Sequence, residues 1–336
     1  MLFTCIDHRF KDEKMKAIVT NKYGPPEVLE LKDVEKPNPK DDEVQVKVRA
    51  ASVNPADWHL LEGKPFMAHL MGGGLFTPKI RRPGSDIAGQ VEAVGEDVNQ
   101  FQLGDEVFGF GVGGFAEYVC RRENALALKP ANISFEEAAA VPVAAVTALQ
   151  GLREVGQIQA GQKVLIDGAS GGVGTFAVQI AKSFGAEVTG VCSTGNLDMV
   201  RSIGADYVID YTREDFTKKK ERYNLILATA GYHSIFDYSH ALNPNGIYVF
   251  IGSSRLMRSL FQVMLIGPLI STIQNKKMKS FVAKISKKDL VFLKDLLEAG
   301  EVKPVIDRRY QLSEVPQALR YLEEGHAKGK VVITVT

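Results

Sequence analysis

The spacing of apolar residues divides the chain into two regions. Between residue 15 and about residue 138, short segments such as 43–48 and 90–94 alternate apolar with polar residues, and turns separate them. This alternation predicts mostly antiparallel β structure. Beyond about residue 139, apolar runs of strand length alternate with helical segments, which predicts a parallel sheet covered by helices. We therefore expect an α/β fold.

The same pattern predicts the individual elements of the second region. A capping-box sequence at 134–137 predicts the start of a helix that continues through 138–152. The predicted strands are 163–166, 187–192, 207–209, 225–228 and 247–251. Toward the C-terminus we expect helices at 288–299 and 313–324 and a last strand at 330–335.

The turn between the strand at 163–166 and a helix at 175–184 is the most informative motif. Its glycines allow a sharp bend and a close approach to phosphates, and the helix N-terminus adds free N–H groups. A purely structural turn is the competing interpretation, but strands flank the motif at the expected distances. We expect a dinucleotide to bind at Ser170, Gly171, Gly172, Val173 and Gly174.

The composition limits the alternatives. A chain of 336 residues with 45% hydrophobic residues suits two domains, and a net charge of +1 gives no global attraction to nucleic acid. The three cysteines, Cys5, Cys120 and Cys192, are widely separated, which fits a reducing cytoplasm and neither a disulfide framework nor a zinc cluster. Residues 1–14 have no signal-peptide pattern, and we expect a disordered extension there.

One apolar segment, at 256–273, is interrupted by Arg258, Gln262 and Pro268, so we do not expect it to span a membrane. It predicts a helix or lid beside the substrate or at a subunit contact. The basic run after it is expected to be a solvated face, with contact to a membrane surface as the alternative. Its lysines are Lys276, Lys277, Lys279, Lys284, Lys287 and Lys288.

From Met15 to Thr336 the chain resembles the medium-chain dehydrogenase/reductase superfamily. Within it, the segment from Gly161 to Lys182 is similar to the quinone oxidoreductase branch, which includes zeta-crystallin. Further similar segments are 52–57, 83–89 and 325–330. The resemblance implies a GroES-like β catalytic domain built from both chain ends, a doubly wound Rossmann domain between them, and an active cleft between the two. We expect the catalytic domain at 15–138 and 287–336, the Rossmann domain at 139–286, and a homodimer.

The resemblance also bears on zinc. The zinc enzymes of the superfamily have metal ligands where this chain has Asn54, Ser85 and a residue near Val143. One carboxylate, Asp86, does not replace such a set, because zinc needs several Cys, His or carboxylate ligands. The four-cysteine structural lobe is also missing. We therefore expect no metal site, and a reaction that works without a Lewis acid.

The predicted second strand of the Rossmann domain ends without a carboxylate, which predicts NADPH over NADH. Ser193, Thr194 and Asn196 supply small polar groups there, although they would also suit a loop that caps the next helix. The resemblance adds three more expected cofactor contacts: Tyr211 at the 2′-phosphate, Ser253 near the nicotinamide and Lys330 as a C-terminal cation of the cleft.

Four residues are candidates for the reacting centre: Asn54, Asp57, His59 and Thr147. Asn54 and Thr147 resemble residues that lie beside the nicotinamide or the substrate in relatives. Their alternative roles are a turn before Pro55 and a hydroxyl bonded to its own helix. His59 could donate a proton, yet a lone histidine is more often structural, and relatives often have a tyrosine nearby.

These observations favour a cytoplasmic, zinc-free reductase that transfers hydride from NADPH to a quinone or an α,β-unsaturated carbonyl. The first alternative is a 2-enoyl thioester reductase. The second is an NADPH-binding protein of low turnover with a structural or partner-binding role.

Overall fold

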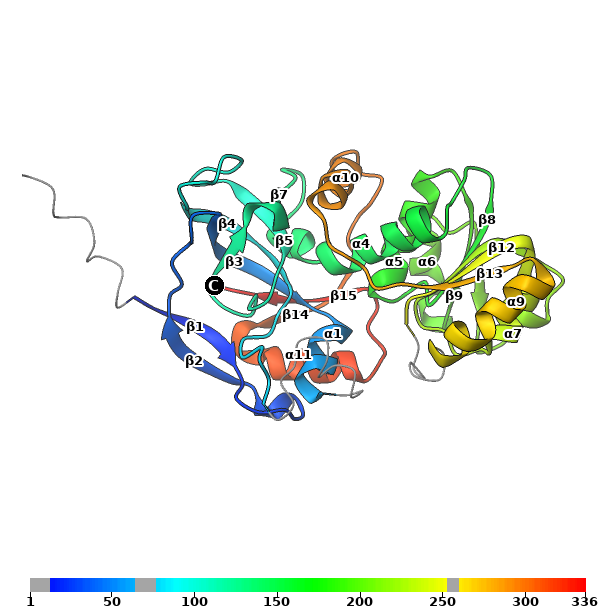
Figure 1. Cartoon of the computed structure of the whole chain (residues 1–336), viewed down its shortest axis with the longest axis horizontal. Coiled ribbons are helices and arrows are strands. Elements are labelled where there is room, and N and C mark those ends of the chain that lie inside the picture. The colour runs from blue at the N-terminus through cyan, green and yellow to red at the C-terminus, as the bar shows by residue number, and fades with distance from the viewer. Residues whose placement is uncertain (1–12, 64–76, 253–259) are drawn as a thin grey trace, which may run out of the picture. The chain divides into compact units, whose positions relative to one another are not determined.

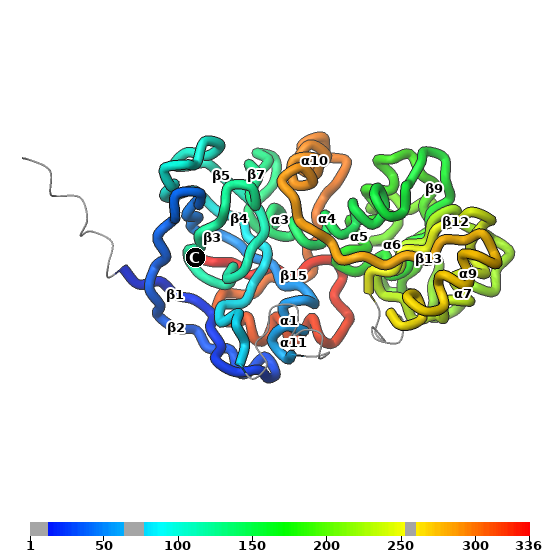
Figure 2. The backbone as a smooth tube through the Cα atoms, viewed as in Figure 1, coloured from blue at the N-terminus to red at the C-terminus, as the bar shows by residue number. Residues whose placement is uncertain are grey.

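The computed structural model describes residues 13–63, 77–252 and 260–336 (Figure 1). The chain forms two compact units. The β unit contains residues 1–142, 308–325 and 331–336, and the α/β unit contains residues 143–307 and 326–330. Figure 2 traces the chain from the first unit into the second and back. This mixed architecture confirms the predicted α/β fold class.

The β unit is built on a seven-stranded sheet with a main strand order of β14-β15-β3-β4-β5-β7, and β6 pairs with β3. A separate antiparallel pair, β1 and β2, completes its strands. The strands are β1 (Lys14–Val19), β2 (Glu30–Glu35), β3 (Glu43–Val53), β4 (Asp86–Val94), β5 (Glu106–Phe110), β6 (Tyr118–Arg122), β7 (Leu126–Leu128), β14 (Ile306–Gln311) and β15 (Lys330–Thr334). The helices are α1 (Pro55–Glu62), α3 (Phe135–Ala139) and α11 (Val315–Glu323).

The α/β unit has a six-stranded parallel sheet in the doubly wound order β10-β9-β8-β11-β12-β13. Its strands are β8 (Lys163–Asp167), β9 (Glu187–Cys192), β10 (Tyr207–Asp210), β11 (Tyr223–Ala228), β12 (Leu242–Phe250) and β13 (Lys277–Ser280). Its helices are α4 (Pro142–Gln150), α5 (Gly172–Ser183), α6 (Leu197–Ser202), α7 (Ile235–Ala241), α9 (Gly267–Gln274) and α10 (Lys287–Glu298). A π-helical turn, Gln262–Ile266, leads into α9.

The predicted helix over 138–152 is interrupted in the structure. α3 ends at Ala139, and α4 begins at Pro142. Proline lacks a backbone N–H and disfavours helical geometry in the residue before it, so the helix stops and restarts there. After α4, Gly151–Val155 form a π-helical turn.

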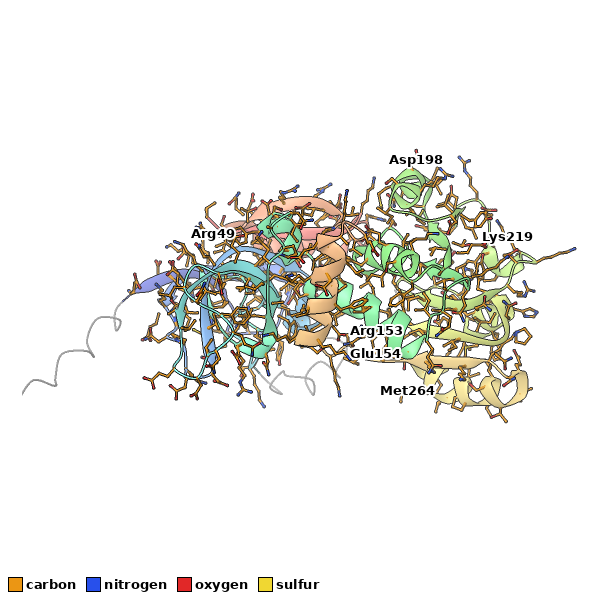
Figure 3. All side chains as sticks on the ribbon, turned by 90° about the horizontal axis from the view of Figure 1, so that it is seen from above. Arg49, Arg153, Glu154, Asp198, Lys219 and Met264 are labelled. Carbon is orange, nitrogen blue, oxygen red and sulfur yellow. The ribbon has the colours of Figure 1, made fainter. Side chains whose placement is uncertain are left out.

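The predicted return to the β unit at residue 287 also differs from the structure, in which residues 287–307 belong to the α/β unit. Side chains on α10, on α4 and on the π-helical turn after α4 explain the difference. Gln150 and Arg153 donate hydrogen bonds to the buried Asp289 at 2.7 and 2.5 Å. Arg153 also pairs with its neighbour Glu154, and Figure 3 labels these two residues. These contacts join residues that are far apart in the sequence, so the spacing of apolar residues does not predict them.

In the described part of the chain, no helix has both the length and the apolar character needed to cross a membrane.

Candidate functional site

The loop between β8 and α5 leaves backbone N–H groups free for an anion. A Cβ built on Gly174 would lie 2.0 Å from the carbonyl oxygen of Gly168, so only glycine lets α5 pack this closely on the loop. The helix begins at Gly172, and its N-cap residue Gly171 has no side chain to satisfy the first N–H groups. Together with the helix dipole, these groups suit a pyrophosphate.

A buried amide joins this loop to the loop after β9. The Nδ2 atom of Asn196 lies 3.2 Å from Ser170 Oγ and 3.1 Å from Ser193 Oγ. Its Oδ1 atom is buried and has no hydrogen-bond partner among the described residues. A buried acceptor without a donor is costly. The site therefore fits a ligand that donates a hydrogen bond there, such as a ribose hydroxyl.

A carboxylate lies beside the loop after β9 and comes from the neighbouring strand. Asp210, at the end of β10, is in register with Cys192 at the end of β9. The hydroxyl of Thr194 donates to Asp210 Oδ2 at 2.5 Å, and Thr212 donates to Oδ1 from its hydroxyl and its backbone N–H at 2.7 and 3.0 Å. The hydrogen bond from Thr194 is the largest cause that holds the pKa of Asp210 below its ordinary value.

Asp210 adds a negative charge beside the loop after β9. The loop itself contains no carboxylate at residues 193–196, whereas β10 brings one to Thr194. The structure also supplies a cation, because Arg213 Nε lies 3.6 Å from Asp210 Oδ2 and its side chain is exposed. Tyr211, beside them, is exposed, and its ring centroid lies 5.8 Å from that of Tyr232. Sequence reasoning missed Asp210 and Arg213 because only strand register shows that they face Thr194.

The segment before β15 lies on the glycine loop. The Gly329 N–H donates to the Ser170 carbonyl at 2.9 Å. Lys330 is 3% exposed, and a Cβ on Gly172 would lie 3.2 Å from its Cδ. The structure thus brings Lys330 to the loop, as the sequence predicts. Ser253 lies outside the described residues.

Immediately before the glycine loop, Asp167 is buried in the α/β unit. Tyr238 on α7 donates its hydroxyl to Asp167 Oδ2 at 2.5 Å. Burial raises the pKa of Asp167, and burial is also the main cause of the raised pKa of Tyr238. Asp167 and Tyr238 are not among the site residues predicted from the sequence. A carboxylate at the end of a buried apolar strand is the signal that could have found it.

In the β unit, Asn54 belongs to a buried polar cluster. Its Nδ2 atom donates to Asp86 Oδ2 at 2.9 Å, and the hydroxyl of Ser52 donates to the same oxygen at 2.8 Å. Asn54, Asp86 and Ser52 are 2%, 0% and 0% exposed. β3 and β4 pair Ser52 with Asp86, and Asn54 follows directly as the N-cap residue of α1. The cluster holds the Asn54 amide in one orientation.

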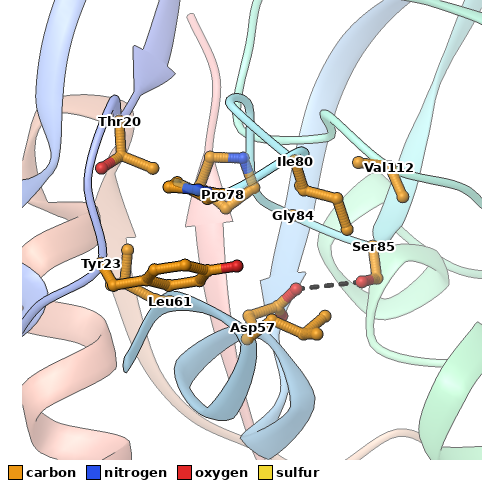
Figure 4. Close-up of a pocket in the computed structure, with 11 residues that line it drawn as sticks. Thr20, Tyr23, Asp57, Leu61, Pro78, Ile80, Gly84, Ser85 and Val112 are labelled. Carbon is orange, nitrogen blue, oxygen red and sulfur yellow. Dashed lines mark hydrogen bonds between the residues drawn. The ribbon is translucent and has the colours of Figure 1, made fainter. Parts of the chain in front are cut away.

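Asp57 lies beside this cluster, at the end of a small pocket (Figure 4). The Asn54 backbone N–H donates to Asp57 Oδ2, and the Ser85 hydroxyl donates to Oδ1, both at 2.9 Å. The other walls are mainly apolar and include Leu61 and Ile80, with Tyr23 across the pocket from Ser85. This pocket has a few fixed polar groups at one end of an apolar surface, and its volume is about 30 Å³.

The other two candidates, His59 and Thr147, each make contacts within their own unit. His59 lies two residues after Asp57 on α1, about 200° further around the helix axis. Its ring centroid lies 4.4 Å from that of Trp58. Thr147 belongs to the α/β unit, where its hydroxyl donates to the Val143 carbonyl at 2.6 Å. That hydrogen bond is the alternative role considered for Thr147, so its contact with a nicotinamide stays a prediction.

The residues at the positions compared with metal ligands do not suit a metal. Asn54 and Ser85 of the β unit supply an amide and a hydroxyl, Val143 of the α/β unit supplies no ligand atom, and Asp86 already accepts two hydrogen bonds. Across the described residues, no group of three or more His, Cys, Asp or Glu side chains is arranged to hold a metal ion.

Known proteins resemble the chain over both units. Residues 40–131 match the alcohol dehydrogenase GroES-like domain family, and residues 203–333 match the zinc-binding dehydrogenase family. The chloroplast envelope quinone oxidoreductase homolog of Arabidopsis thaliana is 33% identical over 335 residues, which cover 95% of this chain and 98% of that protein.

Two other matches extend the resemblance. The chloroplastic NADPH-dependent alkenal/one oxidoreductase of Arabidopsis thaliana is 34% identical over 338 residues, which cover 96% of this chain and 80% of that protein. The solved structure of the quinone oxidoreductase from Coxiella burnetii superposes with a TM-score of 0.83 at 30% identity. It covers 96% of this chain and 100% of that one.

Proposed function

Since the chain belongs to the medium-chain dehydrogenase/reductase superfamily, in its quinone oxidoreductase branch, we propose that it uses NADPH, without zinc, to reduce quinones or α,β-unsaturated carbonyls. At the coarser level, the chain is an oxidoreductase that uses a nicotinamide cofactor. One observation carries the finer proposal. Asn54, at a position where the resemblance implies a metal ligand in zinc-dependent relatives, is an amide that donates to the buried Asp86, which also accepts from Ser52.

The residues of the α/β unit fit a dinucleotide. The close packing of Gly174 on Gly168 shapes the loop, and the free N–H groups at the start of α5 would donate to the pyrophosphate. The Asn196 Oδ1 atom, which has no hydrogen-bond partner among the described residues, would accept from a ribose hydroxyl. When bound, NADPH supplies the hydride. The task of this unit is to hold the nucleotide in one position and to keep water from the reacting carbon.

The β unit supports reduction of an acceptor that is already electron-poor. The Asn54 amide donates to Asp86, so this end of the unit holds a neutral amide and no metal ligand set. Ser85 gives its hydrogen to Asp57, so its oxygen can only accept. A neutral amide donor polarises a carbonyl far less than a metal ion does. Quinones and enones need little polarisation, while simple alcohols need an alkoxide that this cluster does not stabilise.

The preference for NADPH rests on the groups around Asp210. Thr194 commits its hydrogen to Asp210, so it does not donate to a 2′-phosphate. Arg213 carries a positive charge on the exposed side of that carboxylate and offsets its repulsion of a phosphate. Ser193, Asn196 and Tyr211 add polar groups nearby, and NADPH is therefore the proposed cofactor.

A specificity experiment tests the cofactor assignment. Ser193→Asp adds a carboxylate beside the ribose without breaking the bond between Thr194 and Asp210, and should narrow or reverse a preference for NADPH. Dissociation constants for NADPH and NADH, measured by titration of both proteins, give the answer. Equal affinities in the unmodified chain contradict the proposal.

A substrate panel tests the reaction. We expect oxidation of NADPH with ortho- and para-quinones and with enones, and poor oxidation of ethanol or a simple secondary alcohol with NADP. Elemental analysis should find no stoichiometric zinc, and a chelator should leave turnover unchanged. Equal turnover on a simple alcohol and on the best quinone or enone, or one zinc per chain, contradicts the proposal.

The same panel separates the two alternatives. Preference for an enoyl thioester supports the thioester reductase, and tight NADPH binding without turnover on any activated alkene or quinone supports the low-turnover binding protein. Homodimer formation and a cytoplasmic location stay predictions. Light scattering and cell fractionation test them, and the latter matters because both relatives described above carry chloroplast names.

A further inference from the structure

The loop after β11, residues 229–232, packs against the glycine loop, and we call it the β11 loop. β8 and β11 are parallel neighbours, and the last residue of β11 is in register with Asp167, the last residue of β8. The Thr229 backbone N–H and hydroxyl both donate to the Asp167 carbonyl at 2.9 Å. A Cβ built on Gly168 would lie 2.7 Å from the Cβ of Ala230. The two loops therefore form one packed surface at the carboxyl ends of the strands, which is where dinucleotides bind in such sheets.

The β11 loop also contacts the end of β12. The Gly231 N–H donates to the Gly252 carbonyl at 3.0 Å, and the Gly252 N–H donates to the Ala228 carbonyl at 3.2 Å. A Cβ built on Gly252 would lie 2.8 Å from the carbonyl oxygen of Thr229. The β11 loop thus joins the glycine loop on one side to the chain after β12 on the other. Its position affects both neighbours.

The hydroxyl of Tyr238, on α7, lies against the backbone of this loop. A Cβ built on Gly231 would lie 2.7 Å from the Tyr238 hydroxyl oxygen. Gly231 is not among the glycines with positive φ, so the close approach of the hydroxyl is the reason for glycine at this position. The tyrosine ring is 1% exposed, and its centroid lies 4.6 Å from that of Tyr248 and 6.0 Å from that of Phe216. The ring therefore has little freedom to move away from the loop.

Asp167 fixes this arrangement at two points. Its backbone carbonyl accepts from Thr229, the first residue of the β11 loop. Its Oδ2 atom accepts from the Tyr238 hydroxyl at 2.5 Å, and that hydroxyl lies against Gly231, the third residue of the loop. Asp167 is 2% exposed, and a buried acceptor that loses its donor is costly, so the hydroxyl is held in one place.

We propose that Tyr238 is a positioning residue for the nucleotide: its hydroxyl, held by Asp167, sets the position of the β11 loop against the glycine loop. It acts through Gly231 and not through the reacting atoms. The inference rests on the proposed function, because it assigns the support of the nucleotide site described there. It applies equally to NADPH and NADH, because the two share the pyrophosphate that the glycine loop suits and differ only in the 2′-phosphate.

Tyr238→Phe tests the proposal, because it removes the hydroxyl and keeps the ring. We expect the dissociation constants of NADPH and of NADH to rise by the same factor of about ten. In quinone reduction, the KM for NADPH should rise by a similar factor, while kcat at saturating NADPH stays within about twofold. Fluorescence titration and steady-state kinetics measure these changes. A residue that only stabilises the core would lower the melting temperature without this division between KM and kcat.

A second variant tests the contact between Tyr238 and the loop. Gly231→Ala adds a methyl group 2.7 Å from the hydroxyl oxygen, which must displace the loop or the ring, and it should also weaken NADPH binding. Tyr238→Phe removes the atom that this methyl group meets. The double variant should therefore bind NADPH more tightly than Gly231→Ala alone, so the two losses of affinity are not additive.

Tyr248→Phe is the matched control. It removes a hydroxyl from the neighbouring buried ring of the same hydrophobic core. NADPH affinity should stay within about twofold of the unmodified chain. Thermal melting of every variant separates a loss of stability from a loss of affinity in the folded protein.

The outcomes distinguish this inference from the proposed function. Unchanged NADPH affinity in Tyr238→Phe overturns the inference and leaves the proposed function intact. Equal losses of affinity in Tyr238→Phe and Tyr248→Phe, or additive losses in the double variant, also overturn the inference. An unmodified chain that binds neither NADPH nor NADH overturns the proposed function and the inference with it.

Discussion

The glycine loop of the α/β unit and the carboxylate cluster of the β unit are two ways to build a binding site. The loop uses backbone N–H groups from one continuous segment, and its shape depends on missing side chains at Gly168 and Gly174. The cluster uses side chains from β3, from β4 and from the start of α1, all fixed by one buried carboxylate, Asp86. This difference predicts that adding a side chain to a loop glycine lowers NADPH affinity. It also predicts that removing the Asp86 carboxylate destabilises the cluster.

The largest effect is expected from Asp86→Ala. It leaves the buried donors of Ser52 and Asn54 without an acceptor, at about 1–3 kcal/mol each. The melting temperature should fall strongly, and kcat should fall in the protein that remains folded. NADPH affinity of that fraction should stay unchanged, because the nucleotide contacts lie in the other unit.

Asp42→Ala is the control for this variant, since Asp42 is half exposed and makes only a surface ion pair with Arg122. It should have almost no effect on melting or on kcat. A similar loss of stability in both variants would contradict the prediction that Asp86 stabilises the chain as the acceptor for Ser52 and Asn54.

Gly174→Ala tests the opposite sensitivity in the loop. The added methyl group would lie 2.0 Å from the Gly168 carbonyl oxygen and must displace backbone. We expect NADPH affinity to fall on the order of 100-fold, equivalent to about 2.7 kcal/mol. Fluorescence titration measures the affinity, and circular dichroism checks the fold.

Gly195→Ala is the matched control, because a Cβ at this position meets no atom within 4 Å. Its NADPH affinity should remain within about twofold of the unmodified chain, a difference of about 0.4 kcal/mol. If the two alanine variants lose affinity equally, close packing is not the reason that the loop contains glycine.

A smaller effect is expected for a residue that contacts only the 2′-phosphate of NADPH, which NADH lacks. Arg213→Gln removes the cation beside Asp210, and NADPH affinity should fall about fivefold, or about 1 kcal/mol, while NADH affinity stays constant. The control Arg122→Gln removes another exposed arginine that pairs with an aspartate. Adenosine 2′,5′-bisphosphate and 5′-AMP provide the same contrast without the nicotinamide. Equal losses for NADPH and NADH would assign Arg213 to the adenosine and not to the 2′-phosphate.

The smallest effect is the pH dependence of stability that comes from the buried pair Asp167 and Tyr238. Burial raises the folded-state pKa of Asp167 above its ordinary value of 3.8. As pH rises from that value, the unfolded chain loses this proton before the folded chain does, so the free energy of unfolding decreases until the raised pKa is passed. Asp167→Asn keeps an acceptor for Tyr238 and removes this dependence.

Urea unfolding across a pH series measures the difference between the two proteins. The variant should gain stability relative to the unmodified chain as pH rises through this window, and the difference should then level off. A constant difference at every pH shows that Asp167 does not keep its proton in the folded chain.

The sequence by itself predicted most of the α/β unit. β8 and β9 follow the predicted strands closely, and α5 starts three residues before its predicted start because Gly172 and Gly174 already belong to its first turn. Apolar periodicity and glycine spacing are local properties, so a single segment contains all the information needed. For the same reason the sequence alone predicts the loop of residues 170–174.

Tertiary structure decided the parts that depend on strand register and on packing between distant segments. Asp210 reaches Thr194 only because β9 and β10 are parallel neighbours, and Asp86 reaches Asn54 only because β3 and β4 pair in one register. α10 belongs to the α/β unit because Asp289 accepts from Gln150, far away in the sequence. Amino-acid spacing carries no record of such contacts, because their distances are set by how strands pair and helices pack.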